Sequence, residues 1–225
     1  RAFTFGDTEK TFETVSEFLE EGTLDEEGKA RISFEAPGGW DPPAAINIQF
    51  LVRVMEDGGR WAPYSFNMPY HAFPFYLGIE KPSGDAVQGK ETSLRIAAVK
   101  PEGEAADPGP LSAEVFLVKR HYNLVRVNNQ TRMQIQKELI PRIEGKVALK
   151  DGVGTFTFTP ESWGEYFIRI TDKTHGSSAS TELFAWTPYG SGDEAGSTLL
   201  DRILIRADKE KYAPGETASV TLRSP

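Results

Sequence analysis

Cysteine is absent from the sequence and histidine is rare, with only three copies in 225 residues. The lack of cysteine excludes disulfide bonds, thiolate metal sites and a cysteine nucleophile. It does not identify the compartment, because many bacterial exported proteins also lack cysteine. The histidines His71, His121 and His175 show none of the short spacings that place two ligands on one metal ion. We therefore expect no metal site and no cofactor.

An excess of basic charge is also missing. The 25 Lys and Arg residues face 33 Asp and Glu residues, which gives a formal net charge of −8 and a pI near 5.1. Because phosphate backbones bind to a concentrated basic face, we expect no nucleic-acid partner. No apolar stretch of this segment is long enough to span a bilayer. Residues 1–4 do not begin a signal peptide, so we expect any export signal to lie upstream.

Sequence motifs for catalysis are missing as well. There is no Gly-x-Ser-x-Gly elbow, and no glycine-rich loop precedes a helical pattern as a phosphate loop would. Glu161 and Glu165 flank Trp163, an arrangement that could combine sugar stacking with acid chemistry. We favour a structural interpretation, in which Trp163-Gly164 closes a turn before a buried strand. The sequence therefore predicts no catalytic residue and no enzyme.

What the chain does have is alternation of apolar and polar residues with period two, which predicts strands with one buried face. Turns rich in glycine and proline separate these stretches. Together they predict an all-β fold of antiparallel sandwiches. Residues 12–19, within an acidic run, show helical spacing, and a short helix and a strand stay equally open there. The alternating stretches are Ile32–Ala36, Ile46–Val54, Phe156–Phe158, Tyr166–Ile170 and Val220–Leu222.

The chain repeats itself out of phase. An acidic turn, a strand and a proline at residues 24–37 recur at 149–160, and a long apolar strand ending near an aspartate follows each. These aspartates, Asp57 and Asp172, are 115 residues apart. A second pair interleaves with the first, because the stretch at Gly89 resembles the one at Gly215, 126 residues later. We therefore predict a slice of a tandem array of domains of about this length.

The repeat predicts how the chain divides. Residues 1–72 are predicted to be the C-terminal part of one β-sandwich, and residues 73–187 a complete one. Residues 188–197, rich in Gly and Ser, are predicted to be a linker and a candidate pivot. Residues 198–225 would be the first strands of a further domain. A partial sandwich leaves an apolar face and sheet edges without partners, so the flanking pieces need partners or are poorly stable alone.

Two stretches of opposite charge stand out. Residues 119–146 carry seven basic groups and two acidic ones, whereas residues 7–27 carry nine acidic groups and one lysine. Opposite patches of this kind could dock neighbouring domains or bind a partner. The other interpretation, two solvated faces with no mutual contact, is the one we favour from the sequence.

Four stretches, in consistent order along the chain, carry a family resemblance. They are Val54–Arg60, Tyr76–Ile79, Trp163–Asp172 and Asp201–Ile205 with Lys211–Ala218. The ordered set is more specific than any one motif, because a Pro-Gly turn is a general hairpin device. On these residues the chain resembles the alpha-2-macroglobulin family, and most closely its bacterial branch.

The resemblance implies tandem macroglobulin-like domains, each a seven-stranded antiparallel sandwich of the fibronectin kind, just before and into the bait-region domain. In that family a protease cuts a bait segment, the molecule changes shape and the protease is caged, and many members carry a Cys-to-Gln thioester. Bait and thioester would lie beyond Pro225, so no residue here is assigned to either. The implied role is a scaffold segment of a broad-spectrum endopeptidase inhibitor. Its implied partners are neighbouring domains of the parent chain and, through the parent, target proteases.

The same resemblance implies export to the periplasm or cell surface, with a lipid anchor on the parent's N-terminus. One alternative is a tandem adhesin or carbohydrate-binding array, in which Trp40, Trp61 and Trp163 would be the platforms. Another is an accessory domain of a secreted hydrolase. The adhesin needs at least two of these rings on one open face, whereas a scaffold packs most of them into cores or junctions.

Overall fold

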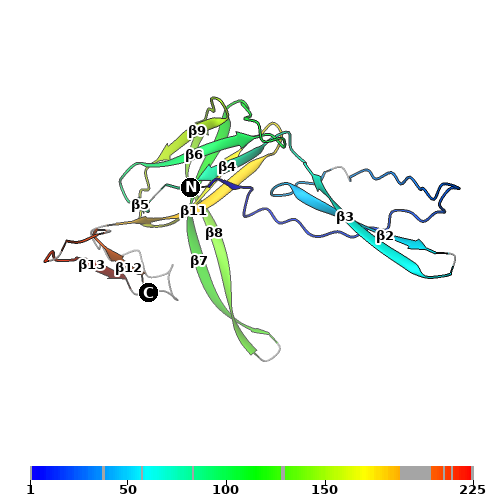
Figure 1. The fold of residues 1–225 in the computed structure, drawn as a ribbon. Coiled ribbons are helices and arrows are strands. Elements are labelled where there is room, and N and C mark those ends of the chain that lie inside the picture. Colours follow the sequence, from blue (N-terminus) through cyan, green and yellow to red (C-terminus); the bar gives the residue numbers. More distant parts are fainter. Residues whose placement is uncertain are drawn as a thin grey trace.

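The computed structural model describes residues 2–36, 39–56, 58–82, 84–127, 130–187, 204–209, 211–213 and 215–223. Within these ranges the chain forms strands and no helix, as the period-two alternation predicts. Most strands build one β-sandwich, and two hairpins lie on either side of it along the sequence (Figure 1). The predicted all-β, antiparallel sandwich fold is confirmed.

Two sheets build the sandwich. One has four strands in the order β1-β4-β6-β9, and the other has five in the order β5-β11-β10-β7-β8. Only the short β5–β11 contact is parallel among the pairs described. Apart from the two-residue strands β1 and β5, these sheets contain the predicted seven strands. The bounds are β1 Thr4–Phe5, β4 Tyr76–Glu80, β5 Ala86–Val87, β6 Thr92–Val99, β7 Leu111–Val127, β8 Gln130–Val147, β9 Val153–Phe158, β10 Gly164–Thr171 and β11 Ser178–Trp186.

The core lies between the two sheets. Each strand turns alternate apolar side chains inward, so that Leu77, Ile79 and Leu94 of the four-stranded sheet pack with Ile168 and Ile170 of the other. All five are at most 1% exposed. Burying a side chain of this size contributes about 1.5–3 kcal/mol, which identifies this cluster as the main source of stability.

The hairpin of β7 and β8 is longer than the sandwich needs. β7 pairs with β10 only from Ser112 to Val118. Beyond Val118 the two strands pair with each other alone and project from the sandwich (Figure 1). We call residues 119–127 and 130–138 the ribbon.

Strand β1 joins the N-terminal segment to the sandwich. Thr4 lies opposite Ile79, and Phe5 lies opposite Gly78 of β4. A Cβ atom on Gly78 would lie 2.9 Å from the Phe5 ring, so the ring fits only because this position is glycine. Residues 4–5 thus complete a sheet of the sandwich, although the predicted boundary assigns them to the preceding domain.

The two outer hairpins are β2 (Ile46–Met55) with β3 (Trp61–Tyr70), and β12 (Leu204–Ala207) with β13 (Val220–Arg223). The last hairpin repeats part of the sandwich. Ile205 lies opposite Leu222 in this hairpin, and Ile79 lies opposite Ile96 in the β4–β6 pair. The sequence offset is the same for both partners, from 79 to 205 and from 96 to 222. The two strand pairs are thus related by the same 126-residue offset that separates Gly89 from Gly215.

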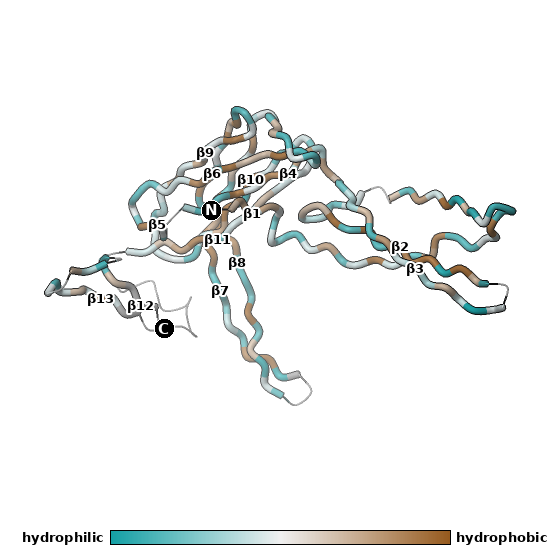
Figure 2. The backbone as a smooth tube through the Cα atoms, in the orientation of Figure 1, coloured by the Kyte–Doolittle hydropathy of each residue, from teal (hydrophilic) through white to brown (hydrophobic). Residues whose placement is uncertain are grey.

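The β2–β3 hairpin presents an apolar face with only partial cover. Phe50 stacks on Phe66 at 4.9 Å between ring centroids, and Phe34 meets Phe50 edge-on at 5.5 Å. Tyr64 and Phe66 nevertheless remain 70% and 45% exposed. Apolar residues gather along this hairpin in Figure 2. This exposure is what a sheet face without its second layer produces.

The acidic segment before this hairpin differs from the sequence prediction. Residues 11–36 contain neither the helix or strand considered at 12–19 nor the strand predicted at Ile32–Ala36. Glu13, Glu17 and Glu21 would repel one another at helical spacing. Val15 and Phe18 are 60% and 81% exposed, so the apolar side chains in the middle of the stretch gain too little burial to offset that repulsion. The predicted linker at 188–197 lies outside the described residues.

Candidate functional site on the outer face of the five-stranded sheet

The outer face of the five-stranded sheet holds a buried aromatic ring. Strand alternation on β10 turns Ile168 toward the core and Phe167 and Arg169 outward. Phe167 is nevertheless 0% exposed, and its neighbour Val118 on β7 is 1% exposed. Outward-facing apolar side chains this deeply buried require a cover on the solvent side of the sheet.

Two cations provide part of this cover. The Lys137 Nζ atom lies 4.8 Å from the centroid of the Phe167 ring, and the Arg169 Cζ atom lies 5.1 Å from it. Phe116 packs against the same ring at 6.0 Å between centroids. A cation near an aromatic face is attracted by the ring quadrupole. Lys137 and Arg169 therefore have an apolar contact that helps fix the positions of their charges.

The N-terminal segment supplies an acidic partner for Arg169. The Arg169 Nε atom donates to Asp7 Oδ2 at 2.7 Å, and Ser178 Oγ donates to the same oxygen at 3.4 Å. The other carboxylate oxygen accepts from the Glu9 backbone N–H at 3.0 Å. Asp7 is only 3% exposed. A buried carboxylate is tolerated when it is paired and hydrogen-bonded in this way.

Backbone contacts hold the same segment against β11. The Thr8 backbone N–H donates to Ser180 Oγ at 2.8 Å, and the Ser180 N–H donates to the carbonyl of Gly6 at 3.0 Å. Gly6 has φ +90°, and a Cβ atom there would lie 2.7 Å from the carbonyl oxygen of Pro43. Glycine is therefore required where the chain leaves β1 and crosses the sheet edge.

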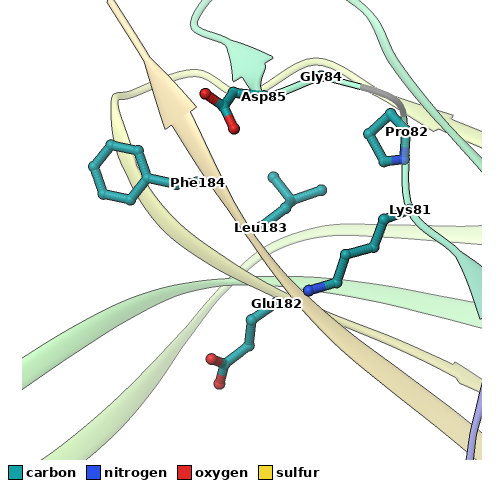
Figure 3. A pocket seen from close by; sticks show the side chains of 7 residues that line it. All are labelled: Lys81, Pro82, Gly84, Asp85, Glu182, Leu183 and Phe184. Carbon is teal, nitrogen blue, oxygen red and sulfur yellow. The ribbon is translucent and has the colours of Figure 1, made fainter. Parts of the chain in front are cut away.

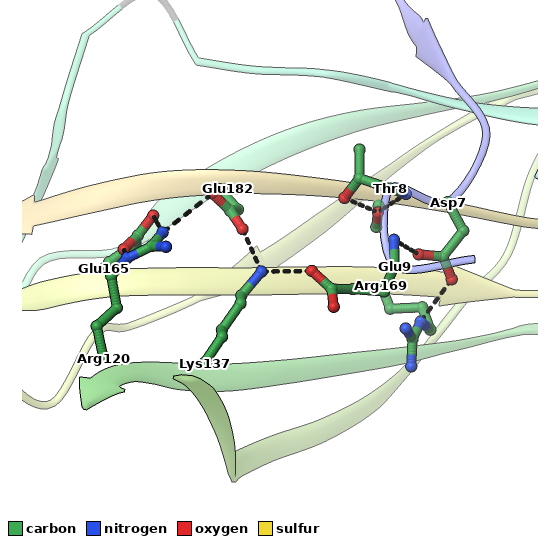
Figure 4. Close-up of polar contacts among 9 residues, drawn as sticks. Asp7, Thr8, Glu9, Arg120, Lys137, Glu165, Arg169 and Glu182 are labelled. Carbon is green, nitrogen blue, oxygen red and sulfur yellow. Dashed lines mark hydrogen bonds and ion pairs between the residues drawn. The ribbon is translucent and has the colours of Figure 1, made fainter. Parts of the chain in front are cut away.

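A second cluster of charges lies beside the first (Figure 4). Lys137 Nζ donates to both Glu9 and Glu182. Arg120 binds Glu165 with two parallel hydrogen bonds, of 2.9 Å from Nε and 2.6 Å from Nη2. Paired contacts of this kind hold a guanidinium in one orientation. We call the residues of both clusters the junction: Asp7, Thr8, Glu9, Arg120, Lys137, Glu165, Arg169, Ser180 and Glu182.

Three members of the junction, Glu182, Lys137 and Arg120, have pKa values shifted toward their charged forms. Burial raises the pKa of Glu182, but its hydrogen bonds, with that from Lys137 the strongest, and the charges of Lys137 and Arg120 together give a net lowering of the pKa. Burial lowers the pKa of Lys137, but its hydrogen bonds to Glu182 and Glu9 outweigh burial and the net pKa is raised. The hydrogen bond to Glu165 raises the pKa of Arg120. These shifts favour the charged forms of Glu182, Lys137 and Arg120, which suits positioning rather than proton transfer.

The two charged stretches noted in the sequence meet at one point. Glu9, from the acidic stretch, and Lys137, from the basic stretch, form an ion pair in the junction. Farther along the acidic stretch, Val15 and Phe18 are 60% and 81% exposed. The contact between the two stretches is thus narrow, and most of both is solvated.

The histidines lie at three separate places. His71 contacts Tyr76 Oη at 3.2 Å, His121 pairs with Glu138 at 2.7 Å and His175 pairs with Asp172 at 2.6 Å. Across the described ranges, no group of three or more His, Asp and Glu side chains is arranged to hold a metal ion.

Glu161 and Glu165, which flank Trp163 in the sequence, do not form an acidic site either. Trp163 is buried at 9% exposed and contacts Phe184, at 6.1 Å between ring centroids. Glu165 is bound by Arg120, and the backbone carbonyl of Glu161 accepts from Gln88 Nε2 at 2.9 Å. The structural interpretation of this turn therefore fits the geometry, because the ring between the two glutamates is buried and Glu165 is held by Arg120.

One open hollow of about 340 Å³ lies next to the junction (Figure 3). Glu182 belongs to both, and Lys81 and Asp85 supply the other charges around the hollow. None of the lining residues is a serine, histidine or cysteine that could act as a nucleophile or base. The remaining lining residues are Pro82, Gly84, Leu183 and Phe184.

Sequence reasoning did not identify the junction. A signal was nevertheless present, because Ser178, Ser180 and Glu182 place polar side chains on one face of a strand whose other face is buried. Arg169 likewise interrupts the apolar strand β10 on the outward side. What the pattern could not show is that the partner of this face lies more than 160 residues earlier in the chain.

Two family models match the chain. Residues 1–70 match the bacterial alpha-2-macroglobulin MG5 domain, and residues 78–186 match bacterial macroglobulin domain 6. A curated relative, alpha-2-macroglobulin of Escherichia coli strain K12, is 24% identical over 249 residues. That match covers 99% of this chain but only 14% of the relative.

Solved structures share the fold. The native conformation of E. coli alpha-2-macroglobulin has a TM-score of 0.57 at 21% identity, over 99% of this chain and 15% of that one. Salmonella alpha-2-macroglobulin reacted with methylamine has a TM-score of 0.56 at 20% identity, over 99% and 15%. E. coli alpha-2-macroglobulin activated by porcine elastase has a TM-score of 0.57 at 20% identity, over 92% and 18%.

The described residues contain no helix that is both long enough and apolar enough to cross a membrane.

Proposed function

Because this chain belongs to the bacterial alpha-2-macroglobulin family, we propose that it is a non-enzymatic scaffold segment of a protease-trapping protein. In this proposal the parent is a broad-spectrum endopeptidase inhibitor, which changes shape and cages a protease after its bait segment is cut. The present segment carries neither bait nor thioester and keeps neighbouring macroglobulin-like domains in position. Its division at residues 72, 187 and 197 is part of the same proposal, as is a periplasmic or cell-surface, lipid-anchored parent.

The junction is the observation that carries this proposal. A scaffold must keep adjacent parts in one geometry until cleavage triggers the change of shape. The buried Asp7–Arg169 pair and the backbone bonds at Ser180 fix residues 6–9 to the outer face of the sheet. Such pairs specify orientation more than they add net stability, because desolvation offsets much of the attraction between the charges.

The tryptophans give the adhesin alternative no aromatic platform. Trp163 is buried. Trp40 packs edge-on against Phe12 and Tyr70, at 5.8 and 5.3 Å between ring centroids. Of the three candidate platform rings, Trp61 alone is strongly exposed, at 54%. A sugar-binding surface would need at least two such rings on one open face.

The test uses the full protein that contains this chain. We would expose it to several unrelated proteases, map the earliest cuts by mass spectrometry and follow its compaction by small-angle scattering. Early cuts clustered outside residues 1–225, followed by compaction and retention of the protease, are expected. Scattered cuts with no compaction and no retained protease would overturn the proposal.

A matched pair of variants connects this test to the junction. Arg169→Leu removes the partner of a buried carboxylate, whereas Arg53→Leu removes an exposed arginine from β2. If the segment is a scaffold, Arg169→Leu should loosen the uncleaved protein and permit compaction before cleavage. Arg53→Leu should behave as the unmodified protein does.

A further inference from the structure

The ribbon carries an exposed apolar face. Leu124 lies opposite Met133, and Tyr122 lies opposite Ile135. Directly opposed residues of an antiparallel pair share one face, so these four side chains form a continuous apolar stripe. Leu124, Met133 and Ile135 are 76%, 54% and 49% exposed. A two-stranded ribbon with an uncovered apolar face is marginal in water, which indicates that the stripe is a contact surface.

The opposite face of the ribbon has a different composition. His121 lies opposite Gln136, and Asn123 lies opposite Gln134. All four side chains are polar and exposed. Between residues 121 and 124 on one strand and 133 and 136 on the other, the ribbon is therefore two-sided, with polar residues on one face and the apolar stripe on the other, as expected when a partner covers only one face.

The apolar stripe continues directly into the junction. Arg120 and Lys137 are the next opposed pair on the same face, one step closer to the sandwich. There the face already binds an acidic, extended segment, because Glu9 pairs with Lys137. Asp7 of the same segment pairs with Arg169 on the outer face of β10. The contact seen in the junction is thus a direct example of the chemistry that this face accepts.

Charge points to the same kind of partner farther out. Residues 119–138 contain five basic side chains and one acidic side chain, and without Arg120 and Lys137, which the junction already pairs, the count is three basic and one acidic. An acidic partner would be attracted to this surface, whereas a basic one would be repelled. The apolar stripe lies along the shaft of the ribbon, and the opposed pair Arg126 and Thr131 lies between it and the turn on the same face. This order favours a partner lying along the shaft over insertion of the tip into a lipid layer.

We propose that the apolar face of the ribbon binds an acidic, extended segment with alternating apolar side chains, supplied by another domain of the same parent polypeptide. The apolar side chains of that segment would cover Leu124, Met133 and Ile135, and its carboxylates would meet the basic residues of the ribbon. This docking rests on the part of the proposed function that makes the chain one of several domains in a single polypeptide. It does not depend on protease capture.

The test is site-specific photo-crosslinking in the full parent protein. A photoreactive phenylalanine analogue replaces Leu124 in one variant and Asn123, on the opposite face, in another. Mass spectrometry then identifies the crosslinked peptide. The expected result is a crosslink from position 124 to an acidic segment of another domain in the same molecule, with at least a tenfold lower yield from position 123.

A second pair of variants tests whether the apolar stripe holds the partner. With the probe at position 135, Leu124→Ser with Met133→Ser should lower the crosslink yield about tenfold, because central apolar contacts dominate such interfaces. The matched change Asn123→Ser with Gln134→Ser should leave the yield unchanged. Urea unfolding of each variant checks that the sandwich stays folded, since these residues lie outside its core.

Each other outcome overturns the proposal. The proposal is wrong if position 124 gives no crosslink, or if it crosslinks to a second molecule or to lipid. It is also wrong if both faces of the ribbon give equal yields. Protease capture is measured separately on the unmodified parent. Failure of capture with an intact position-124 crosslink would refute the protease trap and leave the docking surface standing.

Discussion

Arg169 Nε lies 2.7 Å from Asp7 Oδ2 and joins a strand of the sandwich to a carboxylate 162 residues earlier in the chain. The Asp7 side chain is 2% exposed and the Arg169 side chain 26% exposed. Removing one member of such a pair leaves the other as an uncompensated charge, and the buried carboxylate cannot regain water without leaving its site. Arg169 is therefore the residue whose loss should release the N-terminal segment.

We predict that Arg169→Leu lowers the free energy of unfolding by about 3 kcal/mol, because it leaves Asp7 buried without its cation. Urea denaturation of the 225-residue chain measures this change. Hydrogen exchange should also show faster exchange at the amides of Thr8 and Ser180, whose bonds hold the released segment.

The exposed Arg53 provides the control, and Arg53→Leu should change the free energy of unfolding by less than about 0.5 kcal/mol. Combining Arg169→Leu with Asp7→Asn should recover part of the loss, because no buried charge is then left alone. Equal effects of Arg169→Leu and Arg53→Leu would show that the pair does not hold the segment.

Glu182 makes the junction sensitive to acid. Burial raises its pKa, but its hydrogen bonds, with that from Lys137 the strongest, and the charges of Lys137 and Arg120 together lower the pKa below an ordinary 4.5. A group with a lowered pKa in the folded state adds stability above its unfolded pKa and loses it as pH falls through the folded value. The free energy of unfolding should therefore decline below pH 4.5, and Glu182→Gln should make that decline shallower.

Urea denaturation between pH 3 and pH 7 checks this prediction, with the exposed Glu91→Gln as the matched control. Burial raises the pKa of Asp172, but hydrogen bonds from the His175 side chain and from the Thr174 and His175 backbones, with the charge of His175, together lower it, so some acid sensitivity should persist in both variants. The difference between the two slopes isolates Glu182. Parallel curves for Glu182→Gln and the unmodified chain would contradict the prediction.

The sandwich was predictable from sequence because its signal is local. Ile168 and Ile170 alternate with outward residues, and this pattern alone predicts a strand with one buried face. The repeat between Gly89 and Gly215 was readable for the same reason, and the pairing of Ile205 with Leu222 follows it. Where each element carries its own periodic pattern, chain order and turn residues were enough to infer the fold class.

The junction and the acidic segment depend on distant parts of the chain. Nothing near Asp7 in the sequence indicates Arg169 as its partner, because their pairing is made by the fold. Phe18 has helical spacing within its own stretch but meets no surface that would support a helix. A periodic pattern predicts a helix or strand correctly only where a tertiary contact covers its apolar face. Periodicity alone does not show whether that contact exists.

Gly6 should tolerate no side chain. Its φ of +90° is unfavourable for other residues, and a Cβ atom would lie 2.7 Å from the carbonyl oxygen of Pro43. We predict that Gly6→Ala lowers the free energy of unfolding by about 2 kcal/mol. Thermal denaturation measures the loss. Gly109→Ala is the control, since a Cβ atom there would have open space, and an equal loss in both variants would contradict this account.

Tyr166 combines a fully buried ring with a hydrogen bond back to the preceding turn. Its hydroxyl donates to the carbonyl of Ser162 at 2.9 Å and accepts from the Ser162 N–H at 3.1 Å. A tyrosine that bonds the backbone a few residues upstream fixes the corner where the chain enters a strand of a β-sandwich. Its ring contributes to the core, whereas its hydroxyl sets the path of the chain.

Removing only the hydroxyl separates these two roles. We predict that Tyr166→Phe lowers the free energy of unfolding by about 1.5 kcal/mol, because both Ser162 backbone groups lose a partner while the ring stays in the core. Tyr64→Phe, at a position 70% exposed, should change it by less than about 0.5 kcal/mol. Urea denaturation compares the two variants. If they lose equal stability, the corner is held by ring packing alone and the hydrogen bond to Ser162 adds nothing.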